Sequence, residues 1–259
     1  MNEPVLWQSD GSPHSARFHD RYRSRSGALA QAHVVFFGAC GLPQRWRGRE
    51  QFTVLETGFG LGLNFLATWA AWEADAQRCE ALHFVSVEAY PVAAADIVRS
   101  AQALSPPDIP SPANQADATS PASQLEAQWL ARVPLLALSL AEIWHEPSPG
   151  VHRFDFADGQ MILTVAIGEV LPMLQALTCE ADAVYLDGFS PALNPDMWSP
   201  ATLQAVASHC RPGTPLATYS VAASVRMALQ QLGFRVEKCP GLPPKRHRLR
   251  AVFAVEGVR

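Results

Sequence analysis

The sequence lacks the features of a secreted, disulfide-stabilised protein. Its 259 residues contain five cysteines and no C-x-x-C pair. An odd number of scattered cysteines argues against a disulfide framework and against a zinc site, so we expect reduced thiols, no bound metal and a cytoplasmic location. The first residues, Met1-Asn2-Glu3-Pro4, have neither the basic nor the apolar segment of a signal peptide.

Long apolar runs and an excess of basic charge are also missing. The most apolar later run, residues 129–141, is short and interrupted by Arg132 and Pro134, so we expect no membrane span. The formal net charge of -4 excludes a generally basic surface, and a polyanionic partner would therefore have to bind local patches. The sequence contains two such patches: Arg17, Arg21, Arg23 and Arg25 near the start, and Lys238, Lys245, Arg246, Arg248 and Arg250 near the end.

A glycine-rich turn follows the apolar strand that we expect over residues 52–55, and a helix follows the turn. The glycines are Gly58, Gly60 and Gly62. Glycines at alternate positions let the backbone turn tightly and approach a ligand. A dinucleotide-binding fingerprint needs its third glycine one residue later, where this chain has Leu63. The spacing therefore disfavours a dinucleotide oxidoreductase.

An acidic residue, Glu56, stands immediately before this turn. A carboxylate is unfavourable beside a pyrophosphate but suits a cationic or amino-bearing ligand. S-adenosylmethionine carries both a sulfonium and an α-amino group, and it is the ligand that this combination of glycines and carboxylate favours.

Apolar strands alternate with helices along the rest of the chain. Strands are expected at residues 82–88, 161–167, 183–187, 215–219, 234–238 and 250–255, and helices at 91–104, 125–144, 170–178, 200–209 and 221–232. The Asp158-Gly159 pair predicts a hairpin over residues 151–167, and Pro134 should break or kink its helix. This order predicts an α/β, Rossmann-like, mainly parallel sheet with helices on both faces and one antiparallel strand near an edge.

We expect two regions in the chain. Residues 1–50 form an N-terminal extension packed on the core, and residues 51–259 form the main domain. Residues 104–160 are an insertion in that domain, with a hairpin and a helix. The part over residues 104–124 is rich in Pro, Ala and Ser, which predicts a flexible surface segment.

Acidic residues end four of the predicted strands. In open α/β sheets, ligands bind beyond the carboxyl ends of the strands, so these side chains should meet at one site. Glu56 could face the methionine part of the cofactor, and Glu88 could accept hydrogen bonds from a ribose. The Gly168-Glu169 pair could flank an adenine. Asp187 ends the fourth strand.

Asp187 is the candidate catalytic residue because of the loop that follows it. With Phe189 and Pro191 it could form a cradle for a methyl acceptor. A carboxylate at this place can orient an amine and accept its proton. For Asp196 and Trp198, further along the loop, we expect helix capping and packing instead.

Three segments resemble the MnmD-type methyltransferases, the methyltransferase half of bifunctional MnmC. They are residues 56–66 with the glycine turn, residues 187–198 (Asp-Gly-Phe-Ser-Pro-Ala-Leu-Asn-Pro-Asp-Met-Trp), and residues 216–220 with Val225-Arg226 after them. The similarity runs from about Leu6 to the C-terminus. It implies the class I S-adenosylmethionine-dependent methyltransferase fold. The implied reaction is methylation of the exocyclic amine of 5-aminomethyl-2-thiouridine at the tRNA wobble position.

The resemblance also implies site residues and partners. The predicted catalytic residue is Asp187. The predicted cofactor site consists of Glu56, Gly58, Gly60, Gly62, Asn64, Glu88, Gly168 and Glu169. The predicted tRNA and acceptor site consists of Phe189, Pro191, Arg226, Lys245, Arg246 and Arg248. The implied partners are tRNA and an FAD-dependent oxidase, separate or fused.

The chain departs from the family pattern at three places. The family's Gly-Phe-Gly-Arg-Lys-Arg-Glu-Met-Leu is here the segment 241–249, which keeps the basic pair Lys245-Arg246. The family's Asp-Asp-x-Tyr-Phe is here residues 19–23, and Glu169 replaces an aspartate. These departures concern acceptor positioning. Two other functions remain open from the sequence: an aminopropyltransferase-like enzyme on the same fold, and a non-catalytic nucleotide- or RNA-binding module.

Overall fold

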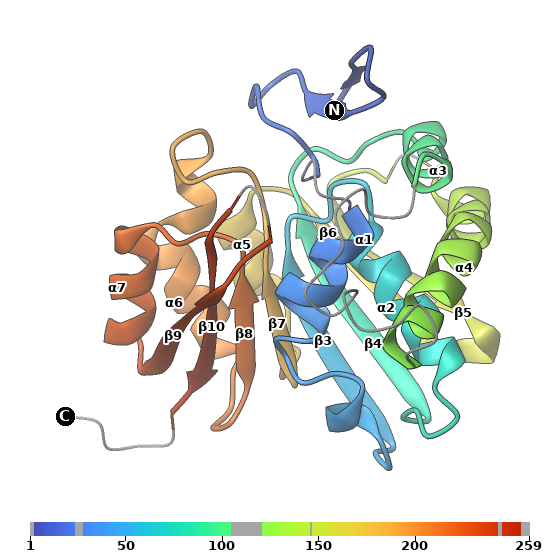
Figure 1. Ribbon diagram of the computed structural model, residues 1–259. Coiled ribbons are helices and arrows are strands. Elements are labelled where there is room, and N and C mark those ends of the chain that lie inside the picture. The colour runs from blue at the N-terminus through green and yellow to red at the C-terminus, as the bar shows by residue number, and fades with distance from the viewer. Residues whose placement is uncertain (1–2, 24–27, 105–120, 146, 243–244, 255–259) are drawn as a thin grey trace.

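The computed structural model describes residues 3–23, 28–104, 121–145, 147–242 and 245–254, without the side chains of residues 121–126 and 130. An eight-stranded sheet with the order β5-β6-β4-β3-β7-β8-β10-β9 forms its centre (Figure 1). The strands are β3 (Gln51–Thr57), β4 (Ala81–Glu88), β5 (Gly150–Phe156), β6 (Met161–Ile167), β7 (Ala183–Leu186), β8 (Pro215–Thr218), β9 (Phe234–Pro240) and β10 (His247–Phe253).

The sheet is parallel in its middle and antiparallel at both edges. Strands β6, β4, β3, β7 and β8 run parallel, so their carboxyl ends meet at one edge. Strand β10 is antiparallel to both β8 and β9, and β5 is antiparallel to β6. The mainly parallel α/β fold predicted from the sequence is confirmed. The hairpin at Asp158-Gly159 is also present, and its first strand adds a second antiparallel edge to the same sheet.

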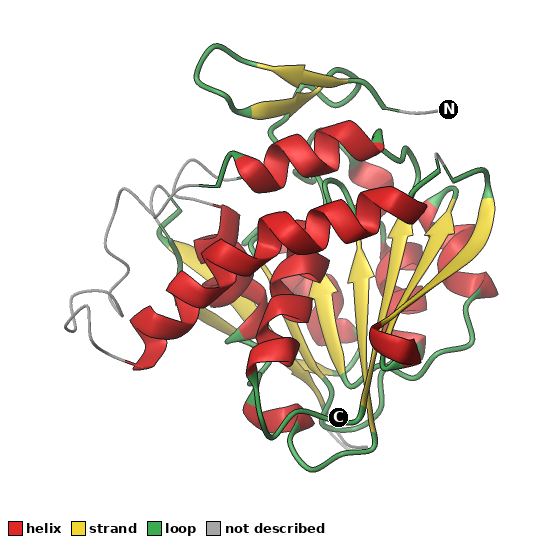
Figure 2. Ribbon diagram, turned by 90° about the vertical axis from the view of Figure 1, so that its right-hand side faces the viewer, coloured by secondary structure: helices red, strands yellow, loops and turns green. Residues whose placement is uncertain are grey.

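Helices cover both faces of the sheet (Figure 2). One face carries α2 (Leu63–Ala74), α3 (Ala94–Gln102), α4 (Pro121–Ile143) and η1 (Ala32–Phe37), and the other carries α5 (Val170–Ala176), α6 (Pro200–Ser208) and α7 (Ala223–Gln231). The alternation of side chains along β3 divides the core in two. Val54 packs in the first layer and Leu55 in the second, and both are fully buried.

Short elements complete the fold. They are α1 (Ala28–Gln31), η2 (Gln44–Trp46), η3 (Ala157–Gly159), η4 (Pro195–Trp198) and a separate small sheet of β1 (Val5–Trp7) and β2 (Pro13–Ser15). Among the helices that the structure describes, none combines the length and the apolar composition needed to cross a bilayer.

Helix α4 differs from its prediction. It begins at Pro121, so residues 121–124 belong to a helix rather than to the expected flexible segment, whose residues 105–120 lie outside the described part of the chain. The helix also continues through Pro134 instead of ending there. Proline removes one backbone hydrogen bond, but the buried side chains of Trp129, Val133 and Leu136 on either side of it hold the helix against the core.

Residues 3–23 form a segment that we call the N-terminal strap. The indole Nε1 of Trp7 donates to Asp96 Oδ1 of α3 at 2.7 Å. The Glu3 carboxylate is only 3% exposed and accepts from Ser15 Oγ at 2.7 Å and from the Arg17 backbone N–H at 3.0 Å. The Trp7 contact attaches the start of the strap to α3, and the Glu3 contacts hold the strap's own residues together. The last residues of the strap extend over the carboxyl edge of the sheet.

His209, which directly follows α6, is buried between two backbone carbonyls. Its Nδ1 lies 2.8 Å from Cys179 O, and its Nε2 lies 2.9 Å from Leu174 O. A carbonyl only accepts hydrogen bonds, so both ring nitrogens carry hydrogen and the ring is an imidazolium. The Cys179 side chain and the two carbonyls together raise the pKa of His209 to about 9.

This histidine should make stability depend on pH. Its folded-state pKa of about 9 lies above the ordinary 6.5. Its stabilising contribution is therefore complete below pH 6.5 and is lost as pH rises through 9. The free energy of unfolding of the wild type minus that of His209→Gln should fall by roughly 3 kcal/mol between pH 6 and pH 10.

Urea unfolding at the two pH values measures this excess, and the exposed His145→Gln variant is the control. A difference between wild type and His209→Gln that is the same at both pH values would show that the ring is neutral in the folded protein.

Candidate functional site

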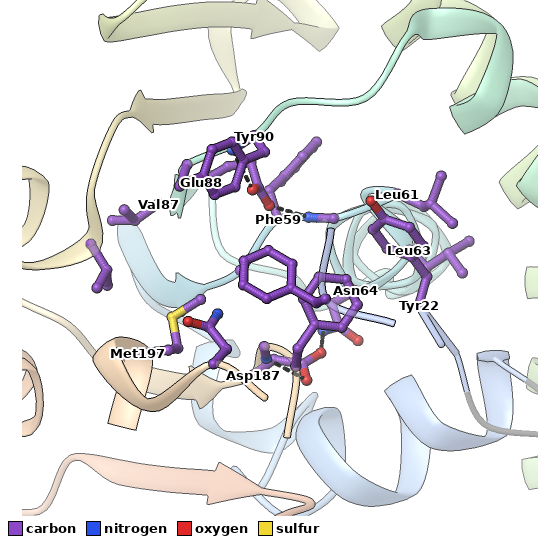
Figure 3. A pocket seen from close by; sticks show the side chains of 18 of the residues that line it. Tyr22, Phe59, Leu61, Leu63, Asn64, Val87, Glu88, Tyr90, Asp187 and Met197 are labelled. Carbon is purple, nitrogen blue, oxygen red and sulfur yellow. Dashed lines mark hydrogen bonds between the residues drawn. The ribbon is translucent and has the colours of Figure 1, made fainter. Parts of the chain in front are cut away.

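A pocket of about 1100 Å³, partly open to solvent, lies at the carboxyl edge of the sheet (Figure 3). Its wall comes from six places in the chain: the N-terminal strap, α1, the glycine turn with the start of α2, the end of β4, the segment directly after β6, and the loop after β7. The pocket therefore occupies the edge at which the sequence placed the acidic residues, and the strap closes one side of it.

The ends of β3 and β7 are in close backbone contact at the floor of the pocket. A Cβ built on Gly58 would lie 3.0 Å from the Cα of Gly188, so a larger residue would push the two strand ends apart. The Thr57 hydroxyl donates to the Asp187 carbonyl at 2.7 Å. These contacts fix the backbone from which the Asp187 side chain projects.

Glu88 ties the glycine turn to the end of β4. Its Oε2 accepts from the Gly60 N–H and its Oε1 from the Tyr90 N–H, both at 2.8 Å. Burial raises the pKa of Glu88 above its ordinary value. Each carboxylate oxygen accepts one backbone hydrogen bond and has further acceptor capacity, so this wall of the pocket can accept hydrogen bonds from hydroxyl groups of a ligand.

Asp187 lies among hydrogen-bond donors. Its Oδ1 accepts from the Gly188 N–H and its Oδ2 from Asn64 Nδ2, each at 2.9 Å. Burial raises the pKa of Asp187 to about 6, although the two hydrogen bonds and the positive charge of Lys245 act in the opposite direction. A carboxylate with this pKa is ionised at neutral pH and is more basic than an ordinary aspartate, as a proton acceptor should be.

The N-terminal strap packs on the loop after β7 through aromatic rings. The Phe18 ring stacks on Phe189 with a centroid distance of 4.8 Å, and the Tyr22 ring meets Phe189 edge-on at 5.1 Å. Asp20 Oδ2 accepts from the Ser190 N–H at 3.0 Å. The sequence analysis did not place Phe18 or Tyr22 in a site, because a strap without periodicity gives no local signal of what it covers.

The pocket wall contains part of the predicted cofactor site, namely Gly58, Gly60, Asn64, Glu88 and Glu169. The other predicted members, Glu56, Gly62 and Gly168, are not in the wall. Glu56 is 1% exposed, and its carboxylate accepts from Ser86 Oγ at 2.7 Å and from Asn64 Nδ2 at 2.9 Å. The structure therefore places Glu56 beneath Asn64 and not facing the pocket, contrary to the expectation that it would face a ligand.

The predicted tRNA residues are more dispersed. Phe189 lines the pocket, whereas Pro191, Arg226 and Arg246 do not. Lys245 and Arg248 line a smaller hollow beside it, together with Tyr219. There the Lys245 Nζ lies 3.6 Å from the centroid of the Tyr219 ring, and the Tyr219 hydroxyl donates to Gly188 O at 2.6 Å. Tyr219 therefore connects the basic loop with the backbone next to Asp187.

The structure corrects one expectation for the loop after β7 and agrees with another. Trp198 is buried and donates from Nε1 to Phe189 O at 2.8 Å, so it packs as expected. Asp196 lines the pocket, and the cap of α6 is Ser199, whose Oγ accepts from the Thr202 N–H. Asp196 therefore belongs to the site rather than to a helix cap.

Tyr90 is a further pocket residue that the sequence analysis missed. Its hydroxyl lies 3.5 Å from Glu169 Oε1, and the Arg17 guanidinium lies 4.0 Å from its ring centroid. Its position two residues after the strand-end carboxylate Glu88 was the signal that could have identified it.

Known sequences match the chain along nearly its whole length. A family model described as S-adenosyl-L-methionine-dependent methyltransferase matches residues 135–254. The chain is 51% identical to the tRNA 5-methylaminomethyl-2-thiouridine biosynthesis bifunctional protein MnmC of Paracidovorax citrulli and 48% identical to that of Delftia acidovorans, each over 98% of this chain. The matches cover 36% and 35% of those proteins, so the chain spans about a third of the length of these relatives.

A solved structure shows the same fold. The crystal structure of MNMC2 from Aquifex aeolicus superposes with a TM-score of 0.65 at 22% identity. The alignment covers 96% of this chain and 70% of that one.

Titration of Asp187 should be visible in stability. Its folded-state pKa of about 6 exceeds the ordinary 3.8. The contribution of the Asp187 carboxyl to stability is therefore complete below pH 3.8, and it is lost as pH rises through 6. The free energy of unfolding of Asp187→Asn relative to wild type should rise by roughly 2 kcal/mol between pH 4 and pH 7. In the variant, the new amide NH₂ faces the donors of Gly188 or Asn64, which adds a penalty that does not change with pH.

Chemical denaturation at several pH values in this range measures how the free energy of unfolding changes with pH. Asp158→Asn in the exposed hairpin turn is the matched control. Parallel pH profiles for wild type and Asp187→Asn would contradict a raised pKa.

Proposed function

The chain belongs to this family of S-adenosyl-L-methionine-dependent methyltransferases, and on that premise we propose that it methylates the wobble uridine of tRNA. The proposed reaction transfers a methyl group to the exocyclic amine of 5-aminomethyl-2-thiouridine and gives 5-methylaminomethyl-2-thiouridine. The observation that supports it most is the identity of 51% to a protein of 5-methylaminomethyl-2-thiouridine biosynthesis over 98% of this chain. The carboxylate at the pocket floor supports it independently, because an amine acceptor must lose a proton.

The pocket residues fit the cofactor in shape and charge. The backbone at Gly58 and Gly60 leaves room for a ligand above the turn, and Glu88 can accept hydrogen bonds from a ribose diol. Glu169 also lines the wall, on the side of Tyr90, whose hydroxyl lies 3.5 Å from its Oε1, and it can accept from an adenine amino group. When bound there, the cofactor supplies an electrophilic methyl group on a cationic sulfur, and the acidic wall is complementary to that charge.

Asp187 is the proposed proton acceptor. It orients the acceptor amine by accepting a hydrogen bond from its N–H group, and it takes the proton that the nitrogen loses on methylation. The raised pKa makes this carboxylate a better base without making it protonated at neutral pH. Phe189, held between Phe18 and Tyr22, forms the aromatic side of the acceptor space.

The remaining length of the relatives points to a second activity. They are named bifunctional, and about two thirds of their length lies outside the match. We infer that an FAD-dependent oxidase, separate or fused, prepares the amine that this chain methylates. Both proteins would act on tRNA in the cytoplasm.

Methyl transfer from labelled S-adenosylmethionine tests the proposal directly. The acceptor is tRNA from a strain that stops at 5-aminomethyl-2-thiouridine, and nucleoside analysis should find the label in 5-methylaminomethyl-2-thiouridine. Asp187→Asn should reduce turnover about 10²–10⁴-fold, because the amide cannot accept a proton. Its affinity for S-adenosylmethionine, measured by calorimetry, should stay unchanged.

Label that enters only polyamines or other small amines, or no label in tRNA, would contradict the proposed substrate. Wild-type turnover in Asp187→Asn would remove this residue from the chemistry.

The salt dependence of tRNA binding should identify a phosphate contact in the loop between β9 and β10. Arg246 in this loop is exposed. Arg246→Glu should weaken tRNA binding and reduce the slope of log affinity against log salt by about 0.7–0.9, because one fewer counterion is released.

Arg235→Glu is the matched control, since Arg235 is also exposed but pairs with Val252 at the far end of the same hairpin. Equal slopes for wild type and Arg246→Glu would take this arginine out of the RNA interface.

A further inference from the structure

The side-chain amide of Asn64 lies between two carboxylates beneath the pocket. Its Nδ2 is 2.9 Å from Glu56 Oε1 and 2.9 Å from Asp187 Oδ2, and Figure 3 shows its bond to Asp187. Glu56 Oε1 and Asp187 Oδ2 both accept from the side-chain nitrogen, so the NH₂ end of the amide faces both carboxyl groups. An amide has two N–H groups, and each carboxylate receives one.

The position of Asn64 is fixed by its surroundings. It stands in the first turn of α2, directly after Gly62 and Leu63, and its backbone carbonyl accepts from the Thr68 hydroxyl at 2.7 Å. Below it, Glu56 is held on its other oxygen by Ser86 Oγ at 2.7 Å. The amide therefore cannot turn away from Asp187 without leaving Glu56 short of a donor as well.

We propose that Asn64 is the positioning residue of Asp187, one that orients its carboxylate and favours its ionised form. This proposal rests on the proposed function, in which Asp187 takes a proton from the acceptor amine. With Oδ2 bound to Asn64 and Oδ1 bound to the Gly188 N–H, the remaining acceptor capacity of the carboxylate is available to the pocket. The sequence analysis had instead placed Asn64 among the cofactor ligands.

Charged and titratable groups face Asp187 from several elements. Lys245 from the loop between β9 and β10 stabilises the ionised form of Asp187, and the charge of Asp187 adds to the burial that raises the pKa of Glu56 on β3. Asp20 on the strap and Tyr219 after β8 are further titratable groups near it in the described part of the chain. Besides its own neighbour Gly188, Asn64 is the only described residue that donates a hydrogen bond to the Asp187 carboxylate. Removing that donor should raise the affinity of Asp187 for a proton.

Asn64→Leu, which keeps the size of the side chain and removes both donors, tests the proposal. In the profile of kcat against pH, measured with saturating tRNA and cofactor, the acid limb should shift to higher pH by about one unit. Turnover should recover toward the wild-type value at high pH, and affinity for S-adenosylmethionine should stay within about threefold.

Glu56→Gln is the matched control, because it changes the other end of the same hydrogen-bonded pair and keeps the bond from Asn64 to Asp187. The acid limb of this variant should stay in place or move down, opposite to the shift in Asn64→Leu.

Two results would overturn the proposal. An unshifted acid limb with weakened cofactor binding would make Asn64 a cofactor ligand, and an equal loss of turnover at every pH would make it structural only. Asn64→Ser, which keeps one short donor, gives the same measurement if the leucine variant does not fold. If the wild type methylates nothing, the proposed function fails, and NMR titration of the Asp187 carboxyl in wild type and variant still tests the pKa shift.

Discussion

The backbone contact between the ends of β3 and β7 is the constraint on which the rest of the site depends. Strand β3 lies where the strand order reverses, with β4 on one side and β7 on the other. At such a reversal the connecting chains leave in opposite directions and open a crevice above the strand ends. Gly58 and Gly188 let the two ends approach, and the approach brings the glycine turn, Asn64 and Asp187 to one place.

The sequence was sufficient for the parts of the site that depend on local pattern. The turn around Gly60, the strand ending in Glu88 and the loop after Asp187 each follow from apolar runs and from the residues that end them, and the structure has all three. The mainly parallel sheet follows from the same alternation of strands and helices. Helix α4 shows the limit of this reasoning, since tertiary burial around Pro134 outweighs the local effect of proline.

Glu56 shows why strand-end carboxylates are not equivalent. It still lies within β3, opposite Ser86 of β4 and Tyr185 of β7, so its side chain belongs to the interior of the sheet. Asp187 lies one position beyond the end of β7 and can reach the pocket. A shift of one residue along a strand decides this difference, and sequence patterns locate strand ends less finely than that. The packing of Phe18 over the site could not be predicted for another reason, because it depends on contacts between segments that are distant in the sequence.

The N-terminal strap also sets an order for the formation of the site. Asp20 bonds to Ser190 across 170 positions of the chain, so this contact closes a very long loop. Long-range contacts of this kind form late, because the intervening chain must first become compact. During synthesis, the strap leaves the ribosome before any of the strands on which the pocket stands. The sheet and its helices can therefore assemble around an open crevice, and a segment made before all of those strands is the one that completes it.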